Sequence, residues 1–155
     1  MKRQIQKFPR KNSEFFFENS FEKLKELPVY EDEYSSIQWV KMSSYRNLTI
    51  FPDKFEGKNF NQGETGLCFL FSSLSSIATI PSLIYRLFGN NDNWREAESF
   101  RIYFFYNNER ITISITDNFP LDMEGCWIWS LPGNNEIFCK LIEKAYLKYQ
   151  LIYGE

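Results

Sequence analysis

The segment Gln62-Gly-Glu-Thr-Gly-Leu-Cys68-Phe-Leu-Phe-Ser-Ser-Leu74 leads from a glycine-containing turn into a stretch with helical periodicity. Serines gather on one side of the helical projection, and the opposite side is apolar, with Leu70, Phe71, Leu74, Ile77 and Ala78. Pro81 closes the pattern, because proline cannot continue a helix. The sequence therefore predicts an amphipathic helix that begins near Cys68 and packs one face against a core.

The same helix lies within a charge-free stretch, residues 65–85, which is close to the length of a membrane helix. The serine side and Pro81 favour a helix of the protein core over a membrane span. The N-terminus is basic and lacks the apolar run and small-residue cleavage site of a secretory signal. We therefore expect no membrane-spanning segment.

The residues around Cys68 favour a reactive thiol. The first turn of a helix stabilises negative charge, so a cysteine there is favoured in the nucleophilic thiolate form. The side-chain amide of Gln62 could donate to an oxyanion that develops beside the sulfur, and Gly63 and Gly66 allow a tight turn between the two. The alternative is that Cys68 is a small buried apolar residue. The residues alone leave these two interpretations about even.

Composition narrows the remaining classes of function. The chain has 155 residues, 43% of them apolar and 19% aromatic, which predicts one globular unit with a ring-rich core. A net charge of −2 argues against binding to nucleic acid. The chain has no histidine, so this chain alone can provide neither catalysis by histidine nor a metal site with histidine ligands. Three cysteines without a CxxC pair favour a reducing compartment, the cytoplasm.

The N-terminal part of the chain has few periodic segments. We expect residues 1–14 to form a mobile arm and residues 15–155 to form the folded unit. Residues 14–26 are predicted to be a short helix or an irregular segment. Residues 27–63 contain prolines and glycines without a sustained period, which predicts loops and short extended pieces anchored by Trp39, Tyr45 and Phe51.

The C-terminal half contains clearer signals. A short apolar group follows Pro81 and ends at Gly89. Residues 100–106 and 110–116 flank a short polar link, and the second run alternates isoleucine with threonine or serine, which predicts an antiparallel hairpin. Residues 135–150 carry an apolar stripe that includes Cys139 and predict a long helix. Together these elements predict the α+β class.

Other polar and aromatic residues have weaker functional interpretations. Asp117 and Glu124 could form a carboxylate pair, but carboxylates in turns are more often solvated. Glu143 and Lys144 are interpreted as surface charges of the C-terminal helix. Trp127 and Trp129 alternate as on a strand and are expected to pack rather than to bind a ligand. Phosphate loops, zinc spacings and dinucleotide motifs are absent from the sequence.

Four landmarks in order resemble the catalytic domain of the calpain family, which has a papain-like cysteine protease core. Trp39-Val-Lys41 is similar to the Trp-Lys that precedes the nucleophile loop. Gln62, Gly63, Gly66 and Cys68 fit the family's Gln-Gly-x-x-Gly-Asp-Cys-Trp. Asp117-Asn118-Phe119-Pro120 resembles Asp-Asp-x-Leu-Pro, and residues 136–148 resemble Glu-Phe-Trp-x-x-Leu-Leu-Glu-Lys-Ala-Tyr-Ala-Lys. The match covers roughly residues 39–155 and corresponds to the first, nucleophile-bearing half.

The resemblance implies a first papain-like subdomain over residues 15–155, with a central helix that begins at Cys68, an antiparallel hairpin and a C-terminal helix. It implies an intracellular cysteine endopeptidase that cleaves proteins or peptides, with Cys68 as nucleophile and Gln62 as oxyanion donor. The family's His and Asn, about 130 to 150 residues after the cysteine, would come from a second chain or from missing sequence. The alternatives are an inactive calpain-like module that binds or regulates, and a truncated product without a role of its own.

The chain departs from the family pattern at three positions near the cysteine. Leu67 replaces the family's Asp before the cysteine, and Phe69 replaces the Trp after it. The resemblance also implies calcium, held by carboxylates and loop carbonyls. One of those acids, three residues before the glutamine, is Asn59 here, which argues against a tight calcium site.

Overall fold

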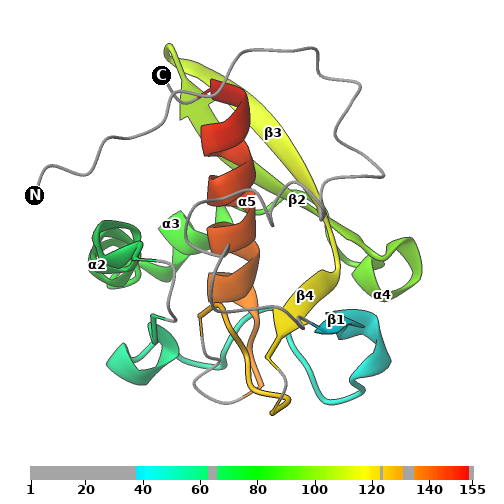
Figure 1. The fold of residues 1–155 in the computed structure, drawn as a ribbon. Helices are drawn as coiled ribbons and strands as arrows, with labels where there is room; N and C mark the ends of the chain where they lie inside the picture. Colours follow the sequence, from blue (N-terminus) through cyan, green and yellow to red (C-terminus); the bar gives the residue numbers. More distant parts are fainter. Residues whose placement is uncertain (1–37, 63–65, 123, 131–134, 154–155) are drawn as a thin grey trace, which may run out of the picture.

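A computed structural model describes residues 38–62, 66–122, 124–130 and 135–153. The expected arm over residues 1–14 and the segment 14–26 lie outside these residues. The described residues combine helices with two small antiparallel sheets, which confirms the α+β class (Figure 1).

The larger sheet is the predicted hairpin. Strand β2 (Ser99–Tyr106) pairs with β3 (Glu109–Thr116) in an unbroken register from Ser99 with Thr116 to Tyr106 with Glu109. Asn107 and Asn108 form the turn with φ of 50° and 64°. Two successive left-handed residues match the twist of a two-residue hairpin, and asparagine tolerates that conformation well. The polar link predicted from the sequence is therefore this turn.

The smaller sheet joins residues far apart in the sequence. Strand β1 (Gln38–Lys41) pairs with β4 (Asn118–Leu121), and Trp39 lies opposite Pro120. Proline lacks an N–H donor and is tolerated here because β4 pairs with a single strand in the described part. This sheet brings the segment around Trp39 against the end of the hairpin.

Short helices connect the strands. The 3₁₀ turns are η2 (Met42–Ser44) and η3 (Gly57–Asn59), and the α-helices are α2 (Cys68–Ile77), α3 (Pro81–Tyr85), α4 (Trp94–Ala97) and α5 (Phe138–Tyr153). Helix α2 begins at the residue predicted for it, and its serines are exposed as expected. Helix α5 begins three residues later than predicted, because Glu136 and Ile137 pair with the backbone of Thr49 instead.

The central helix of the described part is α5 rather than the helix at Cys68. Every residue from Phe138 to Ala145 is buried, whereas α2 buries one face through Leu70, Phe71 and Leu74. In Figure 1, α5 runs through the middle of the ribbon with α2 and α3 on one side and the sheets on the other. Helix α5 is therefore buried nearly all round, and α2 is a flanking helix.

Helix α5 separates two apolar clusters. One contains residues of both sheets with Trp129, Leu141 and Ala145, and the other contains the inner face of α2 with Phe138 and Ile142. Aromatic rings meet edge to face in both, with centroids 5.7 Å apart for Phe119 and Trp129 and 5.1 Å apart for Phe55 and Phe138. The ring-rich core predicted from composition is confirmed.

The burial of charged residues on α5 contradicts the sequence interpretation. Glu143 and Lys144, expected at the surface, are 0% and 6% exposed. The reason is that β3 and β4 cover this side of the helix and offer backbone carbonyls. Lys144 donates to the carbonyls of Thr116 and Asn118 at 2.8 and 2.6 Å. These carbonyls give the buried ammonium the hydrogen-bond partners that a charge away from water needs.

Candidate active site

Cys68 lies at the start of α2, where the sequence predicted it. It is the first residue of α2, exposed, and a free thiol. The preceding residue, Leu67, provides no side-chain cap, and the first turn contains no acidic residue. The N–H groups at this helix end therefore present positive potential beside the sulfur, and no acidic side chain of the first turn offsets it.

The turn into α2 supports the role predicted for one glycine. Gly66 has a φ of 69°, a left-handed conformation that costs glycine nothing because it has no Cβ. Gly63 lies outside the described residues. Gln62 is exposed and stands just before residues 63–65. The approach of the Gln62 amide to the Cys68 sulfur stays a prediction.

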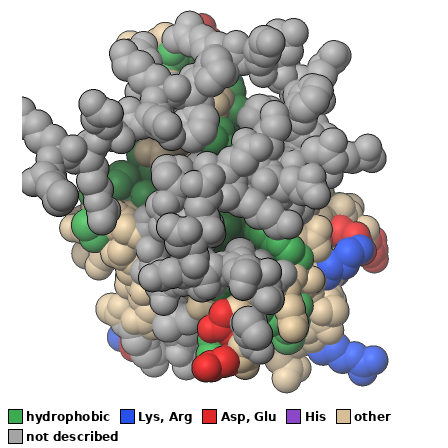
Figure 2. Space-filling view, viewed as in Figure 1, with side chains coloured by type: hydrophobic (Ala, Val, Ile, Leu, Met, Phe, Trp, Pro, Cys, Tyr) green, Lys and Arg blue, Asp and Glu red, His purple; other side chains and the backbone are tan. Residues whose placement is uncertain are grey.

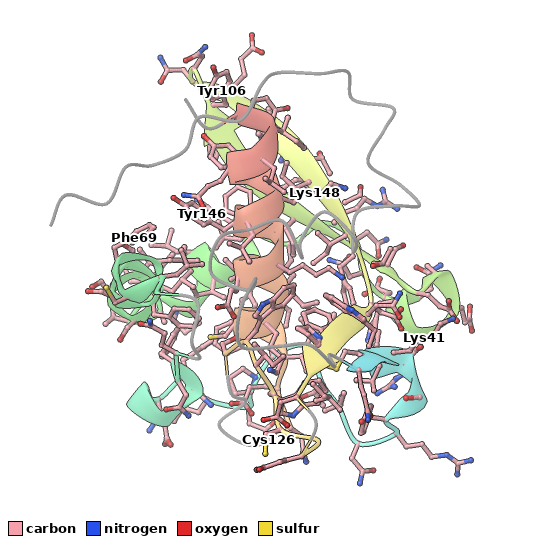
Figure 3. The ribbon with its side chains drawn as sticks, viewed as in Figure 1. Lys41, Phe69, Tyr106, Cys126, Tyr146 and Lys148 are labelled. Atoms are coloured by element: carbon pink, nitrogen blue, oxygen red, sulfur yellow. The ribbon has the colours of Figure 1, made fainter. Side chains whose placement is uncertain are left out.

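The neighbours of Cys68 fix the first turn of α2 against the core. Leu67 and Leu70 are buried in the cluster that includes Phe138 and Cys139. Phe69 remains 51% exposed, and its ring meets Tyr146 of α5 edge to face at 5.7 Å. Figure 3 shows Phe69 and Tyr146 on facing elements. The residue after Cys68 therefore presents an aromatic ring that is half exposed and packs against α5.

The segment that leads to Gln62 is anchored on α5 through Asn59. The Asn59 side chain accepts a hydrogen bond from the Glu56 N–H at 2.5 Å and donates one to the Glu136 carboxylate at 2.7 Å. The Cys139 thiol donates to the Asn59 carbonyl oxygen at 3.1 Å. Asn59, Glu136 and Cys139 are all at most 4% exposed. Sequence analysis had treated Asn59 only as a missing acid, and its structural role lies in this network.

The donor set around Asn59 does not fit a calcium ion. Calcium is bound by oxygen ligands, whereas the side-chain nitrogen of Asn59 points at the Glu136 carboxylate. The Asn59 carbonyl is already paired with the Cys139 thiol. Across the residues that the structure describes, no group of three or more His, Cys, Asp or Glu side chains could hold a metal ion. We therefore assign no step to calcium at this place.

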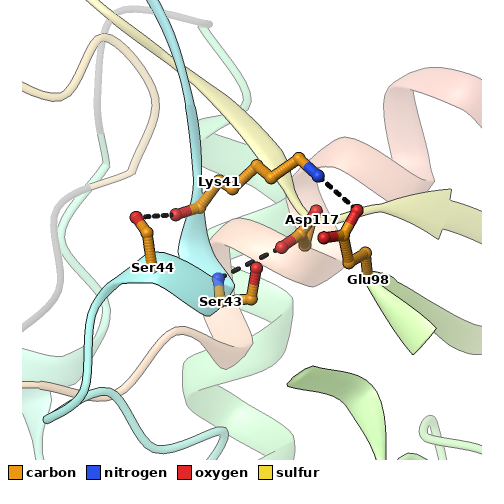
Figure 4. Close-up of polar contacts among 5 residues, drawn as sticks. All are labelled: Lys41, Ser43, Ser44, Glu98 and Asp117. Carbon is orange, nitrogen blue, oxygen red and sulfur yellow. Dashed lines mark hydrogen bonds and ion pairs between the residues drawn. The ribbon is translucent and has the colours of Figure 1, made fainter. Parts of the chain in front are cut away.

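Asp117 differs from the solvated turn carboxylate that was expected. It is 1% exposed and accepts a hydrogen bond from the Ser43 N–H at 3.1 Å. Figure 4 shows it beside the ion pair of Lys41 and Glu98. Glu124 instead is exposed, in a turn held by the Asp122 carboxylate. The two acids occupy unlike environments, one structural and one solvated, which argues against a catalytic pair.

The tryptophans pack as expected. Trp129 is 2% exposed and meets Trp39 edge to face, with ring centroids 6.1 Å apart. The Trp127 ring lies under the Lys140 ammonium, whose nitrogen is 4.4 Å from the ring centroid. Both tryptophans support the core and the buried charges of α5 rather than an open binding surface.

Two buried lysines of α5 make stability depend on pH. Burial lowers the pKa of Lys140 to about 7 against the raising influence of Glu143, and burial lowers the pKa of Lys144 to about 7 against that of Asp117. In the unfolded chain both return to about 10.5. Between these values the unfolded state binds more protons, so the free energy of unfolding increases as pH rises.

We therefore expect urea denaturation to show rising stability from about pH 7 to about pH 9. Lys140→Met should reduce the slope, by up to about 1.4 kcal/mol per pH unit. A wild-type profile that is flat or falls over this range would contradict the prediction.

The charge of the visible surface and the length of the helices bear on other classes of site. On the face in Figure 2, the charged side chains of the described residues that can be seen are few and of both signs, and they form no broad basic patch. Of the helices in the described ranges, none is both long enough and apolar enough to cross a membrane.

Comparison with known proteins identifies the family. A sequence model of the calpain family of cysteine proteases matches residues 5–155. The chain is also similar to calpain-5 of Mus musculus, with 27% identity over 120 residues. That alignment covers 68% of this chain and 18% of calpain-5, so the chain spans less than one fifth of the length of that relative. The chain therefore belongs to the calpain family of cysteine proteases.

Proposed function

We propose that the chain is the nucleophile-bearing part of a calpain-type cysteine endopeptidase, with Cys68 as nucleophile and Gln62 as oxyanion donor. One observation supports this above the others. In a chain of a cysteine protease family, Cys68 is an exposed free thiol at the first residue of a ten-residue helix. Structural cysteines are typically buried, as Cys139 is at 3% exposure.

The proposed reaction proceeds through a thioester. The Cys68 thiolate attacks the carbonyl carbon of a peptide bond, and the carbonyl oxygen becomes an oxyanion that accepts a hydrogen bond from the Gln62 amide. Collapse of this intermediate breaks the C–N bond, and the departing amine must take up a proton. Water then hydrolyses the thioester and regenerates the thiol.

Proton transfer needs a group that this sequence lacks. A Cys–His mechanism uses imidazole as base for the thiol and as acid for the leaving amine, and the chain has no histidine. In our proposal the histidine and its asparagine partner are supplied by a second chain or by further sequence. The substrate is a protein or peptide that meets the thiol beside Phe69.

A second candidate is an inactive calpain-like module that binds a partner or regulates another enzyme. The absence of histidine favours it, as does the loss of the family's Asp and Trp on either side of the cysteine, where Leu67 and Phe69 stand. A longer transcript that encodes a downstream histidine would favour the endopeptidase. A transcript that ends at this chain, with no partner that supplies a histidine, would favour the module.

The compartment that we propose is the cytoplasm. The structure shows Cys68, Cys126 and Cys139 as free thiols, and a reducing compartment keeps them so. An exposed nucleophilic thiol would be oxidised readily outside such a compartment.

We expect the purified chain to cleave no fluorogenic peptide, with or without calcium, because it has no histidine to protonate the leaving amine. Iodoacetamide should nevertheless label Cys68 faster than Cys139, as measured by mass spectrometry of the digested protein. Burial raises the pKa of the Cys139 thiol and also blocks access to it.

Cys126 provides the matched control, because it is also an exposed free thiol but does not begin a helix. Faster labelling of Cys68 than of Cys126 would support activation by the helix, and equal rates would contradict it. Peptide turnover that Cys68→Ala abolishes would contradict the need for a missing histidine.

A further inference from the structure

We propose that the hydrogen bond from Asn59 to Glu136 holds the segment before Gln62 in place without a metal ion, so that the candidate site of this chain forms independently of calcium. The link to catalysis rests on the proposed function. The latch, defined here as Asn59, Glu136 and Cys139, is a property of the fold that can be tested on its own.

The orientation of the Asn59 amide is fixed by its two side-chain contacts. Its oxygen accepts from the Glu56 N–H, so its nitrogen must face the Glu136 carboxylate. A flipped amide would place two donors together on one side and two acceptors together on the other. The N–H group therefore occupies the side of the Glu136 carboxylate on which a cation would otherwise sit.

Backbone hydrogen bonds fix the position of Glu136. It bridges to Thr49, and the next residue, Ile137, donates its N–H to the Thr49 carbonyl at 3.0 Å. The Phe138 N–H donates to the Ile50 carbonyl at 2.9 Å. The carboxylate is therefore held by backbone pairing at the start of α5, and Asn59 reaches it from 77 residues away in sequence.

The chemistry of position 59 decides whether this arrangement needs a cation. An aspartate there would face Glu136 with like charge in a buried place, and either protonation of one carboxylate or a divalent cation would have to relieve the repulsion. The neutral amide instead donates a charge-assisted hydrogen bond to the carboxylate. The Cys139 thiol in turn occupies the Asn59 carbonyl, a second oxygen that a cation could use.

The latch continues directly into the candidate site. Asn59 ends η3 and lies three residues before Gln62. On the other side, Cys139 lies in the same apolar cluster as Leu67 and Leu70, which flank Cys68. Asn59 before Gln62 and Leu67 before Cys68 are thus both held against α5, and we expect loss of the latch to loosen the residues around Asn59 and to uncover the Cys139 thiol.

The test compares thermal unfolding and Cys139 labelling in EDTA and in millimolar CaCl₂. Wild type should show the same Tm in both. Asn59→Asp should have a Tm about 5 to 10 °C lower in EDTA. Its Cys139 should be labelled about tenfold faster, since one lost buried hydrogen bond shifts a local opening equilibrium by about that factor. CaCl₂ should reverse both effects, and MgCl₂ should do so less because Mg²⁺ demands a stricter geometry.

Three control variants separate the effect of charge at position 59 from other effects of the substitution. Asn61→Asp makes the same change at an exposed position two residues away and should respond little to calcium. Asn59→Asp with Glu136→Gln carries one carboxylate and should recover stability without a calcium response. Asn59→Ala should uncover Cys139 whether or not calcium is present, and it serves if the aspartate variant does not fold in EDTA.

Stabilisation of wild type by CaCl₂ that Glu136→Gln removes would overturn the proposal. So would an Asn59→Asp variant with unchanged Tm and unchanged Cys139 protection. Because Cys139 reports on the latch and Cys68 on nucleophile character, failure of the proposed function would appear as slow Cys68 labelling with the Cys139 results intact.

Discussion

Replacing Phe138 with alanine is expected to lower the free energy of unfolding by about 3 to 5 kcal/mol. Phe138 is 0% exposed and begins α5, the helix that separates the two apolar clusters. Its ring meets those of Phe55 at 5.1 Å and Phe60 at 5.5 Å. Removing it leaves a cavity that the surrounding rings fill only partly, because a packed core relaxes incompletely around a deleted side chain.

Urea denaturation followed by tryptophan fluorescence would measure the loss. Phe105→Ala is the matched control, because Phe105 is 67% exposed on β2 and its truncation should change stability by no more than about 0.5 kcal/mol. Phe138→Leu should retain part of the stability. A loss below about 1 kcal/mol for Phe138→Ala would show that the cluster around α2 closes without this ring.

The same ring connects stability to the candidate site. Phe55 and Phe60 flank η3, so Phe138 holds from the apolar side the segment that Asn59 holds from the polar side. We therefore expect Phe138→Ala to raise the labelling rate of Cys139 as well. The stability of the fold and the position of the segment before Gln62 therefore depend on the same helix, α5.

Elements with a strong local period were predictable from the sequence. The hairpin of β2 and β3 followed from alternating isoleucines, and α2 began at Cys68 because one face is apolar and Pro81 closes it. Pairing of β1 with β4 was not predictable. It joins two four-residue strands almost eighty residues apart, and neither carries enough pattern to select the other.

The charged residues of α5 misled the sequence interpretation for a physical reason. A helical pattern separates apolar from polar residues and assumes that the polar side faces water, but α5 is covered by β3 and β4 on that side as well. One signal was present. Lys140, Lys144 and Lys148 recur every four residues, the spacing of a face that packs, and each donates to a backbone carbonyl.

The candidate site was only partly predictable. The place of Cys68 at a helix start followed from local sequence and is confirmed. The contact of Asn59 with Glu136 was not foreseen, because a polar pair separated by 77 residues leaves no local pattern. The only trace of this contact in the sequence is that position 59 carries an amide where the family carries an acid. What that change means depends on which residue faces position 59 in the fold.

Breaking the buried charge bridge on α5 is expected to have the second large effect. The Lys140 ammonium donates to the Ser130 carbonyl, and the Glu143 carboxylate accepts from the Ser130 N–H at 2.8 Å. Lys140 is 1% exposed and Glu143 is 0% exposed. Glu143→Gln keeps an acceptor for Ser130 but removes the charge that compensates Lys140, and we expect it to cost about 3 kcal/mol below about pH 7, where Lys140 of the wild type is protonated.

A double-mutant cycle can distinguish the interaction between the Lys140 and Glu143 charges from the effect of lost packing. Lys140→Met should also destabilise, since it leaves Glu143 as a buried uncompensated charge, and the double variant Lys140→Met with Glu143→Gln should be more stable than either single variant. Additive losses would show that the two charges do not interact. Lys41→Met, which breaks the exposed pair with Glu98, should cost little because water and salt screen that pair.

The pH dependence of the stability loss in Glu143→Gln distinguishes charge compensation of Lys140 from the hydrogen bond to Ser130. The Glu143 charge raises the pKa of Lys140 against the lowering effect of burial, which leaves it at about 7. Without that charge the pKa falls further, so Lys140 becomes neutral in the folded variant at lower pH. The destabilisation by Glu143→Gln should therefore be greatest below about pH 7 and should shrink as the pH rises through about 7, because Lys140 is neutral in both folded proteins above about pH 8 and then needs no carboxylate. A loss that stays constant across this range would mean that Glu143 stabilises the fold through its hydrogen bond to Ser130 alone.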